Sequence, residues 1–101
     1  MIFVTGEIVV ETGAVEVVRD ALHNMEQETR KEPGCVAYAF SADINDPNMI
    51  RIFEHWESMD ALTSHFGMPH MALFGAAIAK ITPKSVAVKA WDVAGEIALP
   101  S

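Results

Sequence analysis

The sequence predicts an α+β domain in which a four-stranded antiparallel sheet carries helices on one side. Segments with a two-residue hydrophobic period and segments with a helical period follow one another in the order β-α-β-β-α(α)-β. This order is that of the ferredoxin-like split βαβ arrangement. The chain has 101 residues, of which 50% are hydrophobic, and this suits one domain with one core.

The first predicted strand runs from Met1 to Val10, because β-branched residues alternate along it. The bulky residues that share one face are Ile2, Val4, Ile8 and Val10. Gly6 interrupts this face, which indicates a bulge or a close approach of another backbone. A helix follows, with Thr12 as its expected N-cap. Apolar positions recur at helical spacing from Val15 to Met25, and Pro33-Gly34 ends the helix.

A hairpin is expected next, formed by strands Cys35–Ala42 and Met49–Glu57 around the turn-forming segment 43–48. Strict alternation places three residues of the first of these strands on one face: Val36, Tyr38 and Phe40. In the other strand, one face holds Ile50, Ile52, Glu54 and Trp56.

Two short helices are predicted before the last strand. Ser58 caps the first, which reaches His65, and the second runs from about His70 to Lys80. The last strand is expected from Lys84 to Val93. We assign residues 1–95 to the domain and 96–101 to a C-terminal tail.

Several strands carry bulky apolar groups on both faces, whereas an antiparallel sheet with helices on one side normally shows polar residues on the other. A large exposed apolar face would be a liability for a monomer. We therefore expect a homodimer that pairs through the open sheet face.

Charge and composition exclude several classes of partner. The 14 acidic and 7 basic residues give a net charge of −7, which argues against binding nucleic acid or an anionic membrane surface. Cys35 is the single cysteine, so no intrachain disulfide forms, and a small buried hydrophobe is a better interpretation of it than a reactive thiol. No signal peptide or membrane span is evident, and a cytoplasmic protein is expected.

Several short motifs together resemble the antibiotic biosynthesis monooxygenase family, which includes small quinol monooxygenases. They are, in chain order, Glu32-Pro33-Gly34-Cys35, Asp46-Pro47, Phe53-Glu54-His55-Trp56-Glu57-Ser58, Leu62-Thr63-Ser64-His65-Phe66 and Pro69-His70. The resemblance covers nearly the whole chain and implies a dimeric α+β barrel with a pocket between sheet and helices in each protomer. It also implies oxidation of a phenol or hydroquinone by O₂ without flavin, haem or metal.

Some members of the family bind and degrade haem instead. Those members carry an asparagine on the first strand, and the segment from Met1 to Val10 has none. Haem degradation is therefore the less favoured interpretation. Some monooxygenases carry an asparagine on the third strand, where this chain has Ile50 and Ile52, and this difference weakens the case for one specific catalytic apparatus. A dimeric module that binds an aromatic metabolite without turnover stays open as the alternative to an enzyme.

His65 is the candidate base, because an imidazole titrates near neutrality and the family has a matching histidine. A solvated or capping histidine near a helix end is the structural alternative. Trp56 and Glu54 are further catalytic candidates by resemblance, although a core tryptophan and an ion-paired carboxylate are the alternatives. The candidates for substrate contact are Tyr38, Ile52, Phe66, His70 and Phe74.

No cofactor is expected. The chain has no glycine-rich phosphate loop, so a dinucleotide is not predicted. A metal site is not expected either, because His65 and His70 are separated by Gly67 and Pro69 and lack the i,i+4 spacing of helical ligand pairs. The expected partners are a small aromatic substrate, O₂ and a second copy of the chain.

Overall fold

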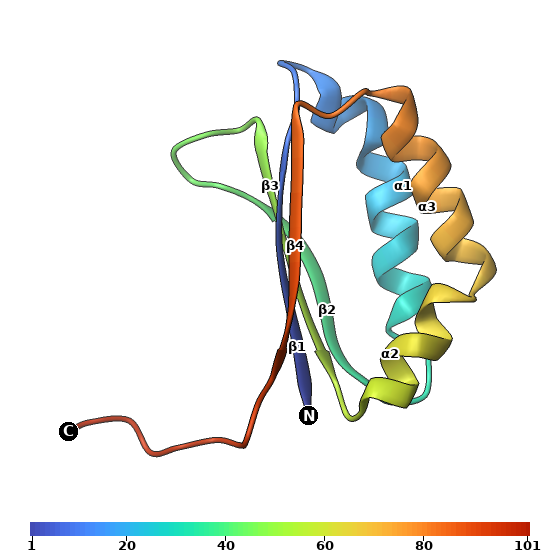
Figure 1. Ribbon diagram of the computed structural model, residues 1–101. Helices are drawn as coiled ribbons and strands as arrows, with labels where there is room; N and C mark the ends of the chain where they lie inside the picture. Colours follow the sequence, from blue (N-terminus) through green and yellow to red (C-terminus); the bar gives the residue numbers. More distant parts are fainter.

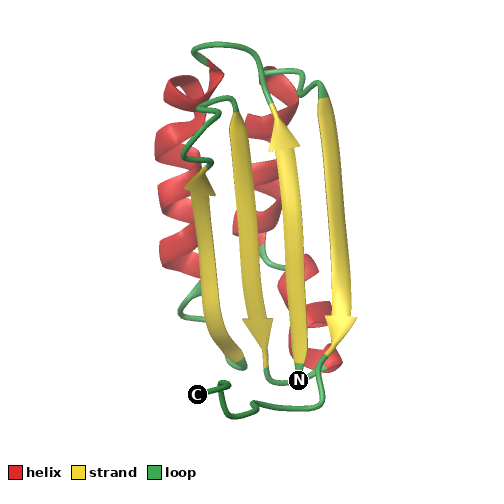
Figure 2. Cartoon of the chain, turned by 90° about the vertical axis from the view of Figure 1, so that its left-hand side faces the viewer, coloured by secondary structure: helices red, strands yellow, loops and turns green.

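The computed structural model describes residues 1–101. The elements are, in order, β1 (Ile2–Val9), α1 (Ala14–Thr29), β2 (Cys35–Ala42), β3 (Met49–Trp56), α2 (Met59–Phe66), α3 (Pro69–Lys80) and β4 (Ser85–Asp92). The strands form one antiparallel sheet in the order β2-β3-β1-β4, and all three helices lie on one side of it (Figures 1 and 2). The predicted ferredoxin-like α+β fold is confirmed.

Two predicted helix caps have different outcomes. Ser58 caps α2 through its hydroxyl, which accepts a hydrogen bond from the Ala61 N–H. The cap predicted for α1 is wrong, because Gly13, with φ of 87°, occupies the N-cap position and α1 has no side-chain cap. The Thr12 hydroxyl instead accepts a hydrogen bond from the Asn48 side-chain amide at 3.1 Å. Thr12 therefore ties the start of α1 to the β2–β3 hairpin.

Strand β2 departs from strict alternation at its start. Cys35 pairs with Trp56 but Ala37 pairs with His55, so Val36 is an extra residue in a β-bulge. Cys35 consequently packs with the core on the helix side, while Val36 is 54% exposed. The predicted assignment of these two residues to faces is wrong for this reason. Beyond the bulge, Tyr38 lies on the helix side in the core with Trp56 and Leu62.

The space between sheet and helices holds two hydrophobic clusters. We call the first the α1 core, and its buried residues are Ile8, Val10, Ala14, Val18, Leu22, Ile50 and Ile52. We call the second the Trp56 core, and its buried residues are Val4, Met25, Tyr38, Trp56 and Leu62. The alternation predicted for β1 and β3 is confirmed, because the inward residues of both strands supply these cores.

The two edges of the sheet differ, because side chains from α1 and its C-terminal end form hydrogen bonds to the β2 edge. On the β2 edge, the Glu26 carboxylate accepts a hydrogen bond from the Phe40 N–H at 2.8 Å, and the Arg30 Nε–H donates to the Tyr38 carbonyl at 2.9 Å. These bonds satisfy edge groups that would otherwise be free to pair with another strand. On the other edge, every residue of β4 is exposed. That side of the protomer is open.

The sheet face opposite the helices is uncovered and mixed in character (Figure 2). Phe3 and Phe53 meet there edge to face with ring centroids 5.2 Å apart, and Trp91 is half exposed. Arg51 pairs on the same face with Glu7 and Asp43. The prediction of bulky apolar groups on this face is therefore confirmed for part of it only.

Regular structure ends at Asp92. The residues that follow extend away from the sheet on the side opposite the helices, and Ile97 and Leu99 are almost fully exposed (Figure 1). The boundary that we placed after residue 95 stays a prediction. None of the three helices is long and apolar enough to cross a membrane.

Candidate functional site

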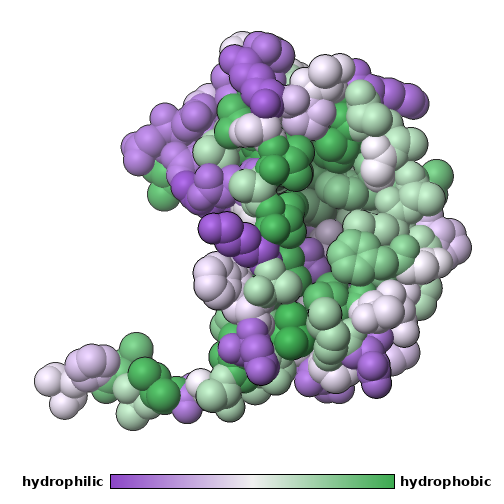
Figure 3. All heavy atoms as spheres, in the orientation of Figure 1, coloured by the Kyte–Doolittle hydropathy of each residue, from purple (hydrophilic) through white to green (hydrophobic).

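A cavity of about 520 Å³ lies between the sheet and helices α2 and α3. Its lining is almost wholly hydrophobic, and its polar members are Glu54, His65 and Lys89, with the Tyr38 ring beside them. Hydrophobic residues gather between β4 and the helices in the space-filling view (Figure 3). The volume falls within the range of about 300–1,000 Å³ found for small-molecule sites.

The cavity exists because α3 does not close onto β4. Helix α3 packs along α1 and has no fully buried residue, so its inward side chains Phe74 and Ile78 are only partly buried. The β4 side chains that face them, Val86 and Val88, are 57% and 50% exposed. The hollow is therefore a gap left in an otherwise packed layer.

His65 lies in the last turn of α2 and is only 1% exposed. The structural alternative of a solvated histidine is wrong. Its Nδ1 lies 2.8 Å from Oε2 of Glu32, and its ring lies against Trp56 with centroids 4.8 Å apart. An ionised carboxylate only accepts hydrogen bonds, so Nδ1 carries the proton in this pair. In that tautomer Nε2 carries no proton, and His65 is one of the few polar residues that line the cavity.

Glu32 is the site residue that sequence reasoning missed. It follows the end of α1, and the Cys35 N–H donates to its carbonyl at 3.2 Å. Gly34 has a φ of 84°, and its carbonyl accepts a hydrogen bond from the Glu57 N–H at 2.9 Å. These bonds fix the loop that carries Glu32 against the end of β3. The one sequence signal was an acidic residue directly before the Pro33-Gly34 helix stop.

His70 reaches the same carboxylate. It lies in the first turn of α3, and its Nε2 is 2.7 Å from Oε2 of Glu32. A short turn joins α2 to α3, and in it the Met68 N–H donates to the His65 carbonyl at 3.1 Å. The two imidazoles therefore lie with ring centroids 6.0 Å apart. As predicted, His65 and His70 do not form a ligand pair on one helix, but the turn between the two helices nevertheless brings both imidazoles to Glu32.

Glu54 and Trp56 form a second buried pair. The Trp56 Nε1–H donates to Oε1 of Glu54 at 2.8 Å. Burial raises the pKa of the Glu54 carboxyl above its ordinary value of 4.5, although the Trp56 hydrogen bond and nearby His65 oppose this in part. Glu54 lines the cavity, whereas Trp56 is 0% exposed and does not line it. Trp56 therefore holds Glu54 and His65 in place from behind.

The predicted contact residues Tyr38, Ile52, Phe66 and Phe74 all line the cavity, and His70 does not. Burial first, and then the negative charges of Glu54 and Glu32, raise the pKa of the Tyr38 phenol far above its usual range. Tyr38 therefore stays protonated and can donate a hydrogen bond. Phe74 stacks on Phe40 with centroids 5.4 Å apart.

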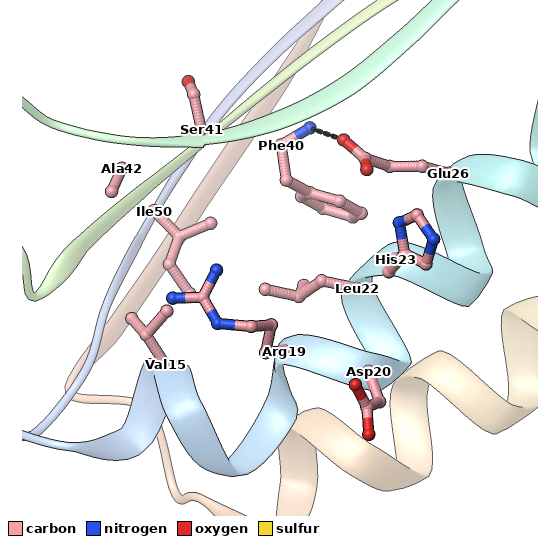
Figure 4. Close-up of a pocket in the computed structure, with 10 residues that line it drawn as sticks. All are labelled: Val15, Arg19, Asp20, Leu22, His23, Glu26, Phe40, Ser41, Ala42 and Ile50. Atoms are coloured by element: carbon pink, nitrogen blue, oxygen red, sulfur yellow. Dashed lines mark hydrogen bonds between the residues drawn. The ribbon is translucent and has the colours of Figure 1, made fainter.

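Another hollow, of about 420 Å³, lies between α1 and the β2 edge (Figure 4). Its polar residues include Arg19, Asp20 and His23, and its Glu26 carboxylate is occupied by the Phe40 N–H. It brings together no buried acid–base pair.

Cys35 is not activated as a nucleophile, since burial raises the pKa of its thiol.

Comparison with known proteins fits this fold and site. The family model for antibiotic biosynthesis monooxygenases matches residues 1–77. The chain belongs to that family.

Solved structures with the same fold are similar along the whole chain. A Deinococcus radiodurans protein, provisionally described as an antibiotic biosynthesis monooxygenase, superposes with a TM-score of 0.91 at 24% identity over 100% of both chains. A Mycobacterium tuberculosis protein reaches a TM-score of 0.84 at 26% identity, covering 96% of this chain and 98% of its own.

Among curated sequences, an uncharacterized protein of Synechocystis is 29% identical over 93 residues. The match covers 92% of this chain and 63% of that protein. The chain thus spans less than two thirds of the length of this relative.

Proposed function

We propose that the protein is a cofactor-independent monooxygenase that oxidises a small quinol or phenol with O₂ in the cavity beneath α2 and α3. The observation that carries this proposal is His65, a buried imidazole that lines an apolar cavity and is held by a carboxylate on its other nitrogen. Membership of the family supports the reaction class. The apolar lining, with few polar groups, suits a flat aromatic ring.

The first step is a proton transfer. The substrate hydroxyl gives its proton to Nε2 of His65, and Glu32 stabilises the imidazolium through the Nδ1–H. Tyr38, which stays protonated, donates to an oxygen of the bound ring. A phenolate gives up electrons to O₂ far more readily than a phenol, so this proton transfer prepares the substrate for oxidation.

The electrons and atoms balance without a cofactor. Reduction of O₂ to one inserted oxygen atom and one water takes four electrons. Oxidation of the quinol to a quinone supplies two, and conversion of one ring C–H bond to C–OH supplies two more. The water takes two hydrogens from the substrate. The protein then needs only to bind the ring, remove the proton and keep water from the intermediate.

Oxygen uptake by the purified protein with menadiol as substrate tests the proposal. We expect His65→Gln to lower the rate by about a hundredfold or more, as loss of a general base does. His23→Gln is the matched control, because His23 is an exposed histidine on α1. Equal rates for wild type and His65→Gln would contradict the role of His65. Saturable binding of the quinol with no oxygen uptake would favour a non-catalytic binding module instead.

We also propose that two copies pair through the open sheet face. The aromatic residues Phe3, Phe53 and Trp91 lie on that face, and the C-terminal tail extends from the same side (Figures 1 and 2). Burial of such groups is the usual driving force for association. We expect a dimer by sedimentation velocity at micromolar concentration and a monomer for Phe53→Glu. Val17→Glu, on the exposed side of α1, is the control. A monomeric wild type would refute the pairing.

A further inference from the structure

We propose that Glu32, His65 and His70 form a binding site for a divalent transition-metal ion such as Zn²⁺. One ligand atom from each residue lies within 4.8 Å of the other two. The three residues come from the end of α1, the end of α2 and the start of α3. Two imidazoles and one carboxylate, gathered from distant parts of the chain, are the donor set of many three-ligand zinc sites.

An unpartnered oxygen supports this assignment independently. Oε2 of Glu32 meets both imidazoles, but Oε1 is buried and has no protein group within hydrogen-bonding distance. The Glu32 side chain is only 5% exposed. A buried carboxylate oxygen without a partner is destabilising, because it has lost its hydrogen bonds to water without replacement. A cation on this carboxylate would relieve that cost.

A metal would require moderate rearrangement of the three ligand atoms. Metal–nitrogen and metal–oxygen bonds of about 2.0–2.2 Å place tetrahedral ligand atoms about 3.3 Å apart. The two nitrogens lie 2.8 and 2.7 Å from Oε2 of Glu32, so these two distances must lengthen by about half an ångström, and all three ligand atoms already lie within 4.8 Å of one another. Imidazole donors select zinc, cobalt, nickel or copper over magnesium or calcium, which prefer all-oxygen sites.

A surface hollow of about 410 Å³ lies beside Glu32. Glu57 and Asp60 also line it, and no Lys, Arg or His does. Its negative potential, within a chain of net charge −7, concentrates cations next to the cluster. The hollow has no lining residue in common with the quinol cavity. A cation in this hollow would therefore lie outside the quinol cavity.

The metal-site proposal is independent of the proposed oxidation, but a bound ion would change the rate of that oxidation. An ion on Nδ1 of His65 forces the imidazole proton onto Nε2, which can then no longer accept a proton from a substrate. The bound ion would therefore inhibit quinol oxidation. Binding is measured without any quinol, so the metal site and the oxidation reaction can fail separately.

Isothermal titration of the metal-stripped protein with Zn²⁺ tests the site. We expect one ion per chain, and we expect His70→Ala and Glu32→Gln each to weaken binding at least tenfold, in line with the loss of a first ligand. His23→Ala and His55→Ala are matched controls that should bind like wild type, since neither residue belongs to the cluster. Circular dichroism checks that each variant folds, and His70→Asn replaces His70→Ala should the latter unfold.

Titration with Co²⁺ gives a second readout. Visible absorption of a low-symmetry cobalt complex should appear with wild type and vanish with His70→Ala. Absence of binding, or equal binding by wild type and His70→Ala, would overturn the proposal. Loss of binding with His23→Ala or His55→Ala alone would assign the ion to the surface, which also overturns it.

Discussion

The layer between sheet and helices has a closed half and a hollow half. The α1 core is closed, because Val18 on α1 and Ile50 on the sheet are each only 2% exposed. Under α2 and α3, Phe74 faces Val88 across an open cavity. Tight packing and empty space are therefore separated in this small domain: α1 supplies the packing, and α3 leaves the cavity in which we propose that a ligand binds.

Truncation of a closed-half side chain should have the largest effect on stability. Ile50→Ala should lower the free energy of unfolding by about 2–5 kcal/mol, because it leaves a cavity in a packed core. The matched change in the hollow half, Val88→Ala, should cost less than about 1 kcal/mol, since Val88 is already half exposed. Urea unfolding measures both. Equal losses would show that the hollow half is packed in solution.

Gly34→Ala should destabilise the loop that carries Glu32. A Cβ at Gly34 would lie 2.5 Å from the Ala61 Cβ, and the φ of 84° is unfavourable for alanine. The backbone conformation costs about 1–2 kcal/mol and the overlap adds about 1–3 kcal/mol. Thermal unfolding measures the loss. Gly75→Ala is the control, because nothing lies within 4 Å of a Cβ at that position. Similar stability of the two variants would contradict the close approach of Gly34 to α2.

Filling the hollow half should affect binding and leave folding unchanged. Val88→Phe adds volume at the cavity wall and should weaken quinol binding by about tenfold, which is about 1.4 kcal/mol. Ala76→Phe, on the exposed side of α3, is the control. Fluorescence titration gives the affinity, and urea unfolding should show both variants close to wild type. Unchanged quinol affinity in Val88→Phe would place the ligand elsewhere.

Glu54 should give the smallest effect, a change in how stability depends on pH. Its pKa is raised in the folded protein, so the folded state holds a proton that the unfolded chain releases near pH 4.5. The contribution of Glu54 to stability is therefore greatest below that pH and declines as the pH rises through the raised pKa. Glu54→Gln should make this decline shallower. Urea midpoints between pH 4.5 and pH 8 test it, and a steeper decline in the variant would contradict the assignment.

The sequence predicted the element order and the inward face of β3 because strict alternation leaves one consistent register. It failed at Cys35 and Val36, since no residue type there demands a bulge. It also failed at Thr12, where Gly13 supplies the turn and the threonine finds a distant partner. Such local choices depend on contacts that the rest of the fold creates.

For the candidate site, the sequence and the family resemblance identified His65 and the residues around the cavity, but not Glu32. The carboxylate lies 33 positions from His65 and 38 from His70 along the chain. Helical spacing could not bring these residues together, because their contact depends on the turn between α2 and α3 and on the Gly34 turn.

The most direct test of the central claim is an NMR titration of the ¹⁵N-labelled protein with 2-naphthol, a phenol that mimics the substrate ring. Ligand binding in the hollow half predicts that the largest amide shifts occur at Tyr38, Phe66 and Val88, while Val18 in the closed half stays unchanged. Binding in the hollow half would be contradicted if the largest shifts occurred around His23 and Ser41 beside α1, or around Phe53 and Trp91 on the open sheet face.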